Sequence, residues 1–177
     1  GELGFELIAP NSAVEQLWDE LAGAAENVGG GLAGLGARDT LRTEMGYPLH
    51  GQDISPSITP VEAGMSWAIG WDKPTFGGRE ALVRQRESGP ARRLRALRAT
   101  QRAVPRSHMD VLSSEGATVG EVTSGTFSPT LKEGIALALV DASVSSDDEV
   151  VVDVRGRHVP FAVVKAPFVA SNVRADG

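Results

Sequence analysis

Three histidines are the side chains of this chain best suited to binding a metal or moving a proton: His50, His108 and His158. A zinc or facial-triad site needs several such ligands at helical or hairpin spacing. These histidines have no such spacing to one another or to a pair of carboxylates. We interpret them as unrelated loop or surface residues and predict no metal site. Cysteine is absent, which excludes thiolate nucleophiles, thiolate metal sites and disulfides.

Arginine is concentrated in one stretch of the chain. Nine arginines lie between Arg79 and Arg106, and the six at positions 92, 93, 95, 98, 102 and 106 have no acidic residue among them. Such a run can bind nucleic acid or an acidic protein, or it can be the solvated face of a sheet. No aromatic residue interleaves with them, and the net charge is -6, so we predict no nucleic-acid partner. We favour the solvated face and keep an acidic protein partner as the alternative.

The remaining general features exclude several classes of protein. The glycine cluster at residues 29–31 follows a predicted helix and not a strand, which makes a phosphate-binding loop a weak interpretation. No apolar run is long enough for a transmembrane helix, so we predict no membrane association. The first residues carry neither an initiator methionine nor the features of a signal peptide. We therefore expect a cytoplasmic chain whose sequence begins inside a longer one.

The elements that must position any site begin with a helical N-terminal part. Alternation over residues 4–9 predicts a strand that ends at Pro10. Ser12 and Glu15 have capping-box spacing, and apolar residues recur at helical intervals to residue 25. This pattern predicts an amphipathic helix of about four turns, with Trp18 as a core anchor.

A second helix is predicted over residues 35–45, because Gly46 stands at its C-terminal position and Pro48 beyond it. Residues 47–77 are rich in Pro, Gly and Ser and predict a structured loop region with a short strand at 66–69. A short helix is predicted over residues 78–87.

After Pro90 the pattern changes to short β-like runs separated by turn residues. The runs cover residues 94–99, 111–113, 119–123, 135–140, 150–155 and 159–165. Strands at this spacing predict a small antiparallel barrel or sandwich. With 177 residues, of which 41% are apolar, the chain can form one large or two small cores. We predict an α+β fold with a first domain at residues 1–89 and a β-barrel domain at residues 90–177.

Several motifs occur in an order that resembles a known family. The sequence reads GE-x-GFE at 1–6, GLGARDTLR at 34–42, GYPL at 46–49, GQDI at 51–54 and TPVEAG at 59–64. It continues with PR at 105–106, VTSGTFSP at 122–129 and PFV at 167–169. This series resembles the T-protein of the glycine cleavage system, the tetrahydrofolate-dependent aminomethyltransferase. The resemblance covers essentially the whole chain.

The resemblance implies a reaction and two partners. In the family, a lipoylated H-protein carries an aminomethyl group, and tetrahydrofolate accepts the one-carbon unit. The products are 5,10-methylenetetrahydrofolate, ammonia and the reduced lipoyl arm. The first domain would then be part of the folate-binding domain, and the second the family's C-terminal barrel.

The resemblance also implies the folate-binding residues. Glu6 matches the family carboxylate that accepts hydrogen bonds from the pterin ring N–H and amino group, which suits a carboxylate because it accepts two parallel bonds. Arg38 matches the helix arginine of the same site, where a guanidinium fork holds a polar ligand edge. We interpret Arg42 and Glu62 as structural pairing residues, and the motif at 124–129 as a turn that locks barrel strands.

Two departures from the family and two alternatives accompany this interpretation. The family's catalytic aspartate would lie upstream of Gly1, so we expect the 177 residues to be the C-terminal half of the enzyme, inactive alone and with no catalytic residue of their own. Val173 and Arg174 stand where some members carry a folate-contacting aromatic. The alternatives are the folate domain of a dimethylglycine or sarcosine dehydrogenase, and a non-catalytic module that binds an acidic protein. The related iron-sulfur-assembly folate protein usually has a cysteine motif that this chain lacks.

Overall fold

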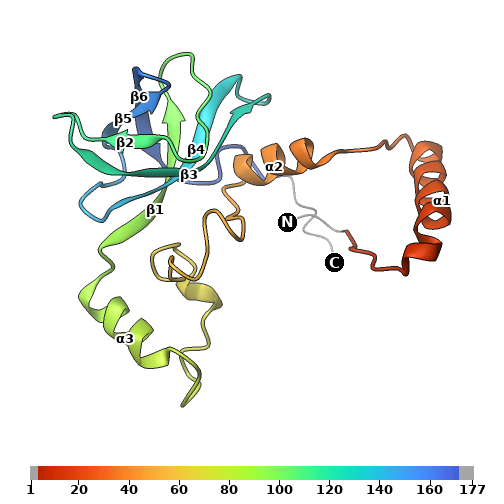
Figure 1. Ribbon diagram of the computed structural model, residues 1–177, viewed down its shortest axis with the longest axis horizontal. Coiled ribbons are helices and arrows are strands. Elements are labelled where there is room, and N and C mark those ends of the chain that lie inside the picture. The colour runs from red at the N-terminus through yellow and green to blue at the C-terminus, as the bar shows by residue number, and fades with distance from the viewer. Residues whose placement is uncertain (1–3, 172–177) are drawn as a thin grey trace. The chain divides into compact units, whose positions relative to one another are not determined.

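The computed structural model describes residues 4–171. They divide into two compact units, one formed by residues 4–39 with 171 and the other by Thr40–Ala170. The fold class is α+β, as predicted, with three α-helices and a closed antiparallel barrel among the described residues (Figure 1). Among residues 4–171, no helix has the length and apolar character needed to cross a membrane.

The first unit contains one complete α-helix, α1 (Val14–Asn27), which follows a short 3-10 helix, η1 (Asn11–Ala13). The predicted helix is confirmed, and it ends before Gly29, whose φ of 75° breaks the helical path. The predicted strand over residues 4–9 is wrong, because these residues are irregular. A strand needs a partner for its backbone groups, and no described residue pairs with this segment.

Two details of α1 also differ from the prediction. No side chain caps its N-terminus, so the Ser12–Glu15 capping box does not form: η1 occupies the position where the cap would begin. Trp18 is 57% exposed and is not a core anchor within the described chain. The apolar face of α1 is real, but none of its residues is buried among residues 4–171.

The second helix, α2 (Leu35–Glu44), ends one residue earlier than predicted. Gly46, with a φ of 68°, takes the left-handed conformation that terminates helices, and a Cβ there would meet the Ala166 side chain at 2.4 Å. The predicted strand near residue 66 is wrong: Ser66–Ala68 form a 3-10 helix, η2. The predicted third helix is confirmed as α3 (Arg79–Ser88).

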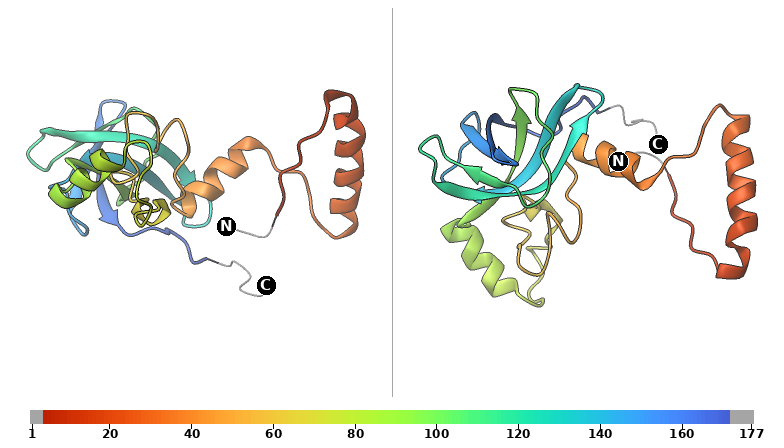
Figure 2. Two further views of the ribbon diagram at one scale, coloured as in Figure 1. Left: turned by 90° about the horizontal axis from the view of Figure 1, so that it is seen from below. Right: turned by 45° about the horizontal axis from the view of Figure 1, so that its top comes forward.

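The six predicted strands all form. They are β1 (Arg92–Ala99), β2 (Asp110–Leu112), β3 (Thr118–Ser128), β4 (Glu133–Asp141), β5 (Glu149–Val154) and β6 (Arg157–Val164). All pairings are antiparallel, and the order β1-β4-β3-β2-β5-β6 closes because β6 pairs with β1 (Figure 2). Alternate residues fill the interior, among them the fully buried Leu97, Val122 and Phe161. Closure leaves no unpaired sheet edge.

Strand β3 is longer than the sequence predicted. Residues 124–128 continue the strand and pair with β4, so the interpretation of residues 124–129 as a turn is wrong for most of the motif. The register shifts between Val122 and Ser124, which indicates a bulge. Glycine at position 125 allows the backbone at Pro105 to approach closely, because a Cβ there would lie 2.7 Å from the carbonyl carbon of Pro105. The glycine serves close packing in this strand, not a turn.

Candidate functional site

The two residues that the sequence assigns to a ligand both lie in the first unit. Glu6 is exposed in the irregular segment before η1, and Arg38 is exposed on the first half of α2. Within residues 4–171, neither side chain has a hydrogen-bond or ion-pair partner, so the two do not pair with each other. Among the described residues, the carboxylate of Glu6 and the guanidinium of Arg38 therefore stabilise no other part of the fold.

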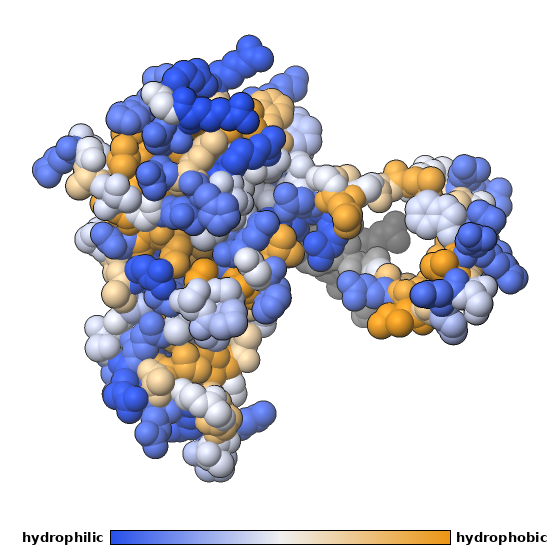
Figure 3. Space-filling model, in the orientation of Figure 1, coloured by the Kyte–Doolittle hydropathy of each residue, from blue (hydrophilic) through white to orange (hydrophobic). Residues whose placement is uncertain are grey.

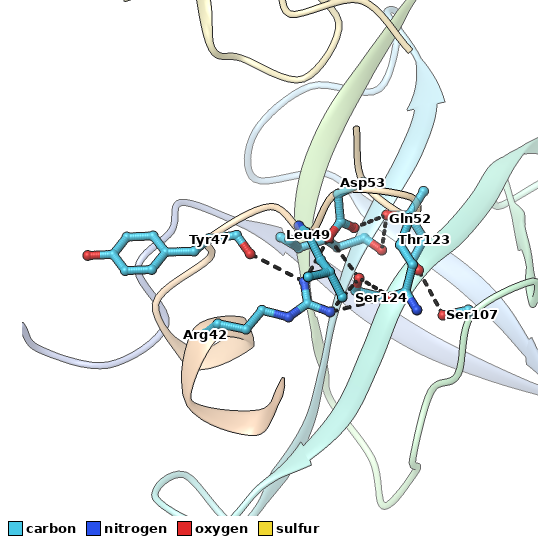
Figure 4. Close-up of polar contacts among 9 residues, drawn as sticks. Arg42, Tyr47, Leu49, Gln52, Asp53, Ser107, Thr123 and Ser124 are labelled. Carbon is cyan, nitrogen blue, oxygen red and sulfur yellow. Dashed lines mark hydrogen bonds and ion pairs between the residues drawn. The ribbon is translucent and has the colours of Figure 1, made fainter. Parts of the chain in front are cut away.

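The most extensive polar cluster lies in the second unit and centres on Asp53, which is fully buried (Figure 4). Nη1 of Arg42, on α2, donates to Oδ2 of Asp53 at 2.7 Å. The backbone N–H of Leu49 donates to the same oxygen at 2.8 Å. The ion pair between Arg42 and Asp53 joins the second half of α2 to the loop that follows it.

Strand β3 completes the cluster from the barrel side. The hydroxyl of Thr123 donates to Oδ1 of Asp53 at 2.5 Å, and that of Ser124 donates to Oδ2 at 2.8 Å. Ser124 in turn accepts from Nη2 of Arg42 at 2.9 Å. Four donors thus surround one carboxylate. A carboxylate with its acceptor positions filled is suited to holding chain segments together and not to abstracting a proton.

Two further buried carboxylates fasten the second unit. Glu44, at the end of α2, accepts hydrogen bonds from the hydroxyls of Ser128 and Thr130, at 2.5 and 3.1 Å. Glu62 accepts from the backbone N–H of Thr59 at 2.9 Å and pairs with Arg92 at 3.1 Å. The predicted structural pairing of Arg42 and of Glu62 therefore agrees with the geometry.

The electrostatic shifts in the barrel follow from pairing and burial. The bond to Glu133 raises the pKa of Arg98, and the bond from Arg98 lowers the pKa of Glu133. Burial and the neighbouring Arg93 lower the pKa of Arg95, whose guanidinium Nε donates to the carbonyl of Val144 at 3.1 Å. Arg92 and Arg98 are exposed, as the solvated-face interpretation predicts, although each pairs with a carboxylate. Arg95 departs from that interpretation, because it is half-buried.

The described residues contain no group of three or more histidines, aspartates or glutamates placed to hold a metal ion. His108 lies beside Glu121, with Nδ1 at 3.1 Å from the carboxylate, in an exposed position. Val173 and Arg174, which the resemblance places near a folate contact, lie outside the described residues.

Sequence reasoning missed Asp53 and Glu44 as anchors. Both are charged residues in loop-like or helix-terminal positions, where a buried carboxylate is the exception. A signal existed in the hydroxyl-rich motif at residues 122–129, whose Thr123, Ser124 and Ser128 supply the partners. Buried carboxylates need such donors.

Comparisons with known proteins agree with this arrangement. A family model described as the GCVT N-terminal domain matches residues 1–73, and one described as the glycine cleavage T-protein C-terminal barrel domain matches residues 92–170. The chain belongs to the glycine cleavage T-protein family. The resemblance read from the motifs is confirmed.

Curated relatives of this T-protein family chain carry the name aminomethyltransferase. The protein from Parafrankia sp. (strain EAN1pec) is 59% identical over 98% of this chain and 48% of its own length. That from Mycobacterium tuberculosis (strain ATCC 25618 / H37Rv) is 51% identical over the same shares. The chain thus spans about half the length of these relatives.

A solved structure supports the fold directly. The crystal structure of glycine cleavage system aminomethyltransferase T from Bartonella henselae matches with a TM-score of 0.82 and 33% identity. The match covers 90% of this chain and 45% of that protein.

Proposed function

We propose that these 177 residues are the C-terminal part of a tetrahydrofolate-dependent aminomethyltransferase. The observation that carries the proposal is the 59% identity to the Parafrankia aminomethyltransferase across 98% of the chain. In the reaction, the aminomethyl group leaves the lipoyl sulfur of an H-protein. Its carbon forms bonds to two nitrogens of tetrahydrofolate, whose hydrogens leave with ammonia and the reduced lipoyl thiol.

The side chains present suit a folate ligand. The pterin edge offers parallel N–H donors, and Glu6 is an exposed carboxylate with no partner among residues 4–171 to compete for it. The guanidinium of Arg38 is also exposed and also has no partner among residues 4–171, so it can bind an anionic or polar ligand edge. When bound, tetrahydrofolate supplies the nucleophilic nitrogens, and the roles of Glu6 and Arg38 are to bind and orient it.

The polar cluster around Asp53 gives α2 a fixed end. Arg42 is held by Asp53 and Ser124, and Glu44 by Ser128 and Thr130. Arg38 lies four residues before Arg42 on the same helix and therefore shares its face. We assign Arg42 and its partners the role of fastening the last turn of α2 to the loop that follows it and to β3.

The domain division remains part of this proposal. We place residues 1–89 in a folate-binding domain whose other part lies in the longer protein, and residues 90–177 in the C-terminal barrel. The separate family models over residues 1–73 and 92–170 support this division. The exposed apolar side chains of the first unit, among them Phe5, Ile8 and Trp18 at 90%, 101% and 57%, support a missing covering part. Apolar surface of this kind gains stability when another part of a protein covers it.

The test uses the full-length protein with tetrahydrofolate and an H-protein whose lipoyl arm carries the aminomethyl group. We expect methylenetetrahydrofolate and ammonia to form in equal amounts, and no product without the H-protein. The dehydrogenase alternative predicts instead that dimethylglycine or sarcosine serves as the one-carbon donor. Product formation from those amines, and none from the H-protein, would refute the proposal.

A further inference from the structure

The side chains of the arginine-rich stretch differ in how many partners they have in the structure. Arg92 and Arg98 pair with carboxylates, and Arg95 donates to a backbone carbonyl. Arg102 has no hydrogen-bond or ion-pair partner among residues 4–171, and Arg106 only donates to the carbonyl of Gly125 at 3.2 Å. These two lie in the loop between β1 and β2 and are exposed.

A second pair of arginines faces the same space. Arg155 lies in the tight turn between β5 and β6, and Arg157 is the first residue of β6. Both are exposed and have no side-chain partner in the described chain. Together with Arg102 and Arg106 they line a pocket of about 540 Å³. The strongly hydrophilic side chains at the top of Figure 3 lie at the end of the barrel where these two loops emerge in Figure 1.

The pocket has an apolar floor and no acidic wall. Its other lining residues are Ala103, Val104 and Val154, and no carboxylate lines it. Its volume is within the range of small-molecule sites, about 300–1,000 Å³. Four like charges repel one another, and an anion between them removes that repulsion. The lining therefore suits an anionic molecule with an apolar body.

Apart from the bond from Arg106 to the carbonyl of Gly125, the following contacts hold both loops without these arginines. Glycines at 125 and 134 let the β1–β2 loop pack closely, since a Cβ on Gly134 would lie 2.4 Å from the carbonyl oxygen of Ala103. In the β5–β6 turn, the N–H of Gly156 donates to Oδ1 of Asp153. Arg155 has a φ of 56°, a conformation that turns of this length usually give to Asn, Asp or Gly. The backbone of the two loops that carry or adjoin the four arginines is thus fixed before a ligand binds.

We propose that this pocket binds a small anion with two or more carboxylate or phosphate groups. Guanidiniums hold such groups through paired hydrogen bonds, and the valine and alanine floor contacts the body of the molecule. The concave shape and the apolar floor favour a compact ligand over an acidic protein surface. The proposal stands independently of the aminomethyltransferase assignment, because neither Glu6 nor Arg38 lines the pocket.

The experiment is calorimetric titration of the full-length protein, without folate, with citrate, pyrophosphate, orthophosphate and a hexaglutamate peptide. We expect citrate or pyrophosphate to bind more tightly than orthophosphate, because more arginines can be engaged at once. The double variant Arg102→Gln/Arg157→Gln should lower that affinity by about tenfold or more. Arg93→Gln is the matched control, since Arg93 is exposed, has no side-chain partner in the described chain and lies outside the pocket.

Several results would overturn the proposal. They are no binding of citrate or pyrophosphate to the wild type, an equal loss in Arg93→Gln, and binding of the peptide alone, which would indicate a protein partner. If the double variant unfolds, Arg157→Lys keeps the charge but loses the paired geometry. It should then lower the affinity measurably, and an unchanged affinity would contradict the assignment. Folate affinity should stay unchanged in all these variants.

Discussion

Glu6 offers the most direct test of the ligand role at the scale of single residues. In the full-length protein, Glu6→Gln keeps the size of the side chain but replaces one acceptor oxygen by a donor that would oppose a pterin N–H. We expect a loss of roughly 2–4 kcal/mol in folate binding, which is a factor of some tens to about a thousand. Folate titration measures it.

The control for Glu6 is its neighbour in the same motif. Glu2→Gln removes the same charge four residues earlier and should change folate affinity little. Equal affinity of Glu6→Gln and the wild type, or a larger loss at Glu2, would show that the wrong carboxylate has been assigned.

Asp53 tests the polar cluster at the same scale. Asp53→Asn turns one oxygen into an amide donor among four donors and leaves Arg42, which is only 10% exposed, without its anion. We expect the free energy of unfolding in urea to fall by about 3 kcal/mol. Asp141→Asn, at the exposed end of β4, should stay within about 0.5 kcal/mol of the wild type. Equal losses in the two variants would contradict the anchoring role.

Strand β1 carries a prediction at the scale of an element, because its arginines differ in the burial of their partners. Arg92 and Arg98 are both 46% exposed, but Glu62 is 8% exposed and Glu133 is 37% exposed. We expect Arg92→Ser to cost about 1–3 kcal/mol of stability, since it strips a buried carboxylate of its cation. Arg98→Ser should cost less than about 1 kcal/mol.

Arg93→Ser is the control on β1 and should be nearly neutral in thermal unfolding.

The contribution of the Arg98–Glu133 pair to stability should depend on pH. The pKa of Glu133 is lowered in the folded state from its ordinary 4.5, so the stabilisation is fully present above that value. This stabilisation is lost as the pH falls through the lowered pKa of Glu133 in the folded state. A difference between wild type and Arg98→Ser that persists below that range would contradict the pairing.

At the scale of the whole molecule, the first unit and the barrel differ in what they bury. The barrel has a closed core of its own, whereas α1 has no buried residue among residues 4–171. We expect a polypeptide of these 177 residues to show no measurable aminomethyltransferase activity, because positioning groups that are removed or misplaced cost orders of magnitude in rate. Methylenetetrahydrofolate formation above background by that polypeptide would refute the expectation.

The sequence by itself determined the elements whose signals are local. The strands of the barrel, the ends of α2 at Gly46 and of α1 before Gly29, and the family motifs all depend on residue type and short-range spacing. Alternation over residues 4–9 predicted a strand that does not form, because pairing requires a partner that local sequence does not specify.

Only the tertiary structure decided which polar residues meet. Asp53 and Thr123 are seventy residues apart in the chain, and their hydrogen bond follows from the packing of the α2 loop on β3. The tertiary structure also gave the arginines of one stretch different partners. Arg92 pairs with a buried carboxylate. Arg102 and Arg106 instead line a pocket together with Arg155 and Arg157. Such contacts depend on closure of the barrel, which brings together segments that are distant in sequence. The spacing of residues along the chain therefore does not predict them.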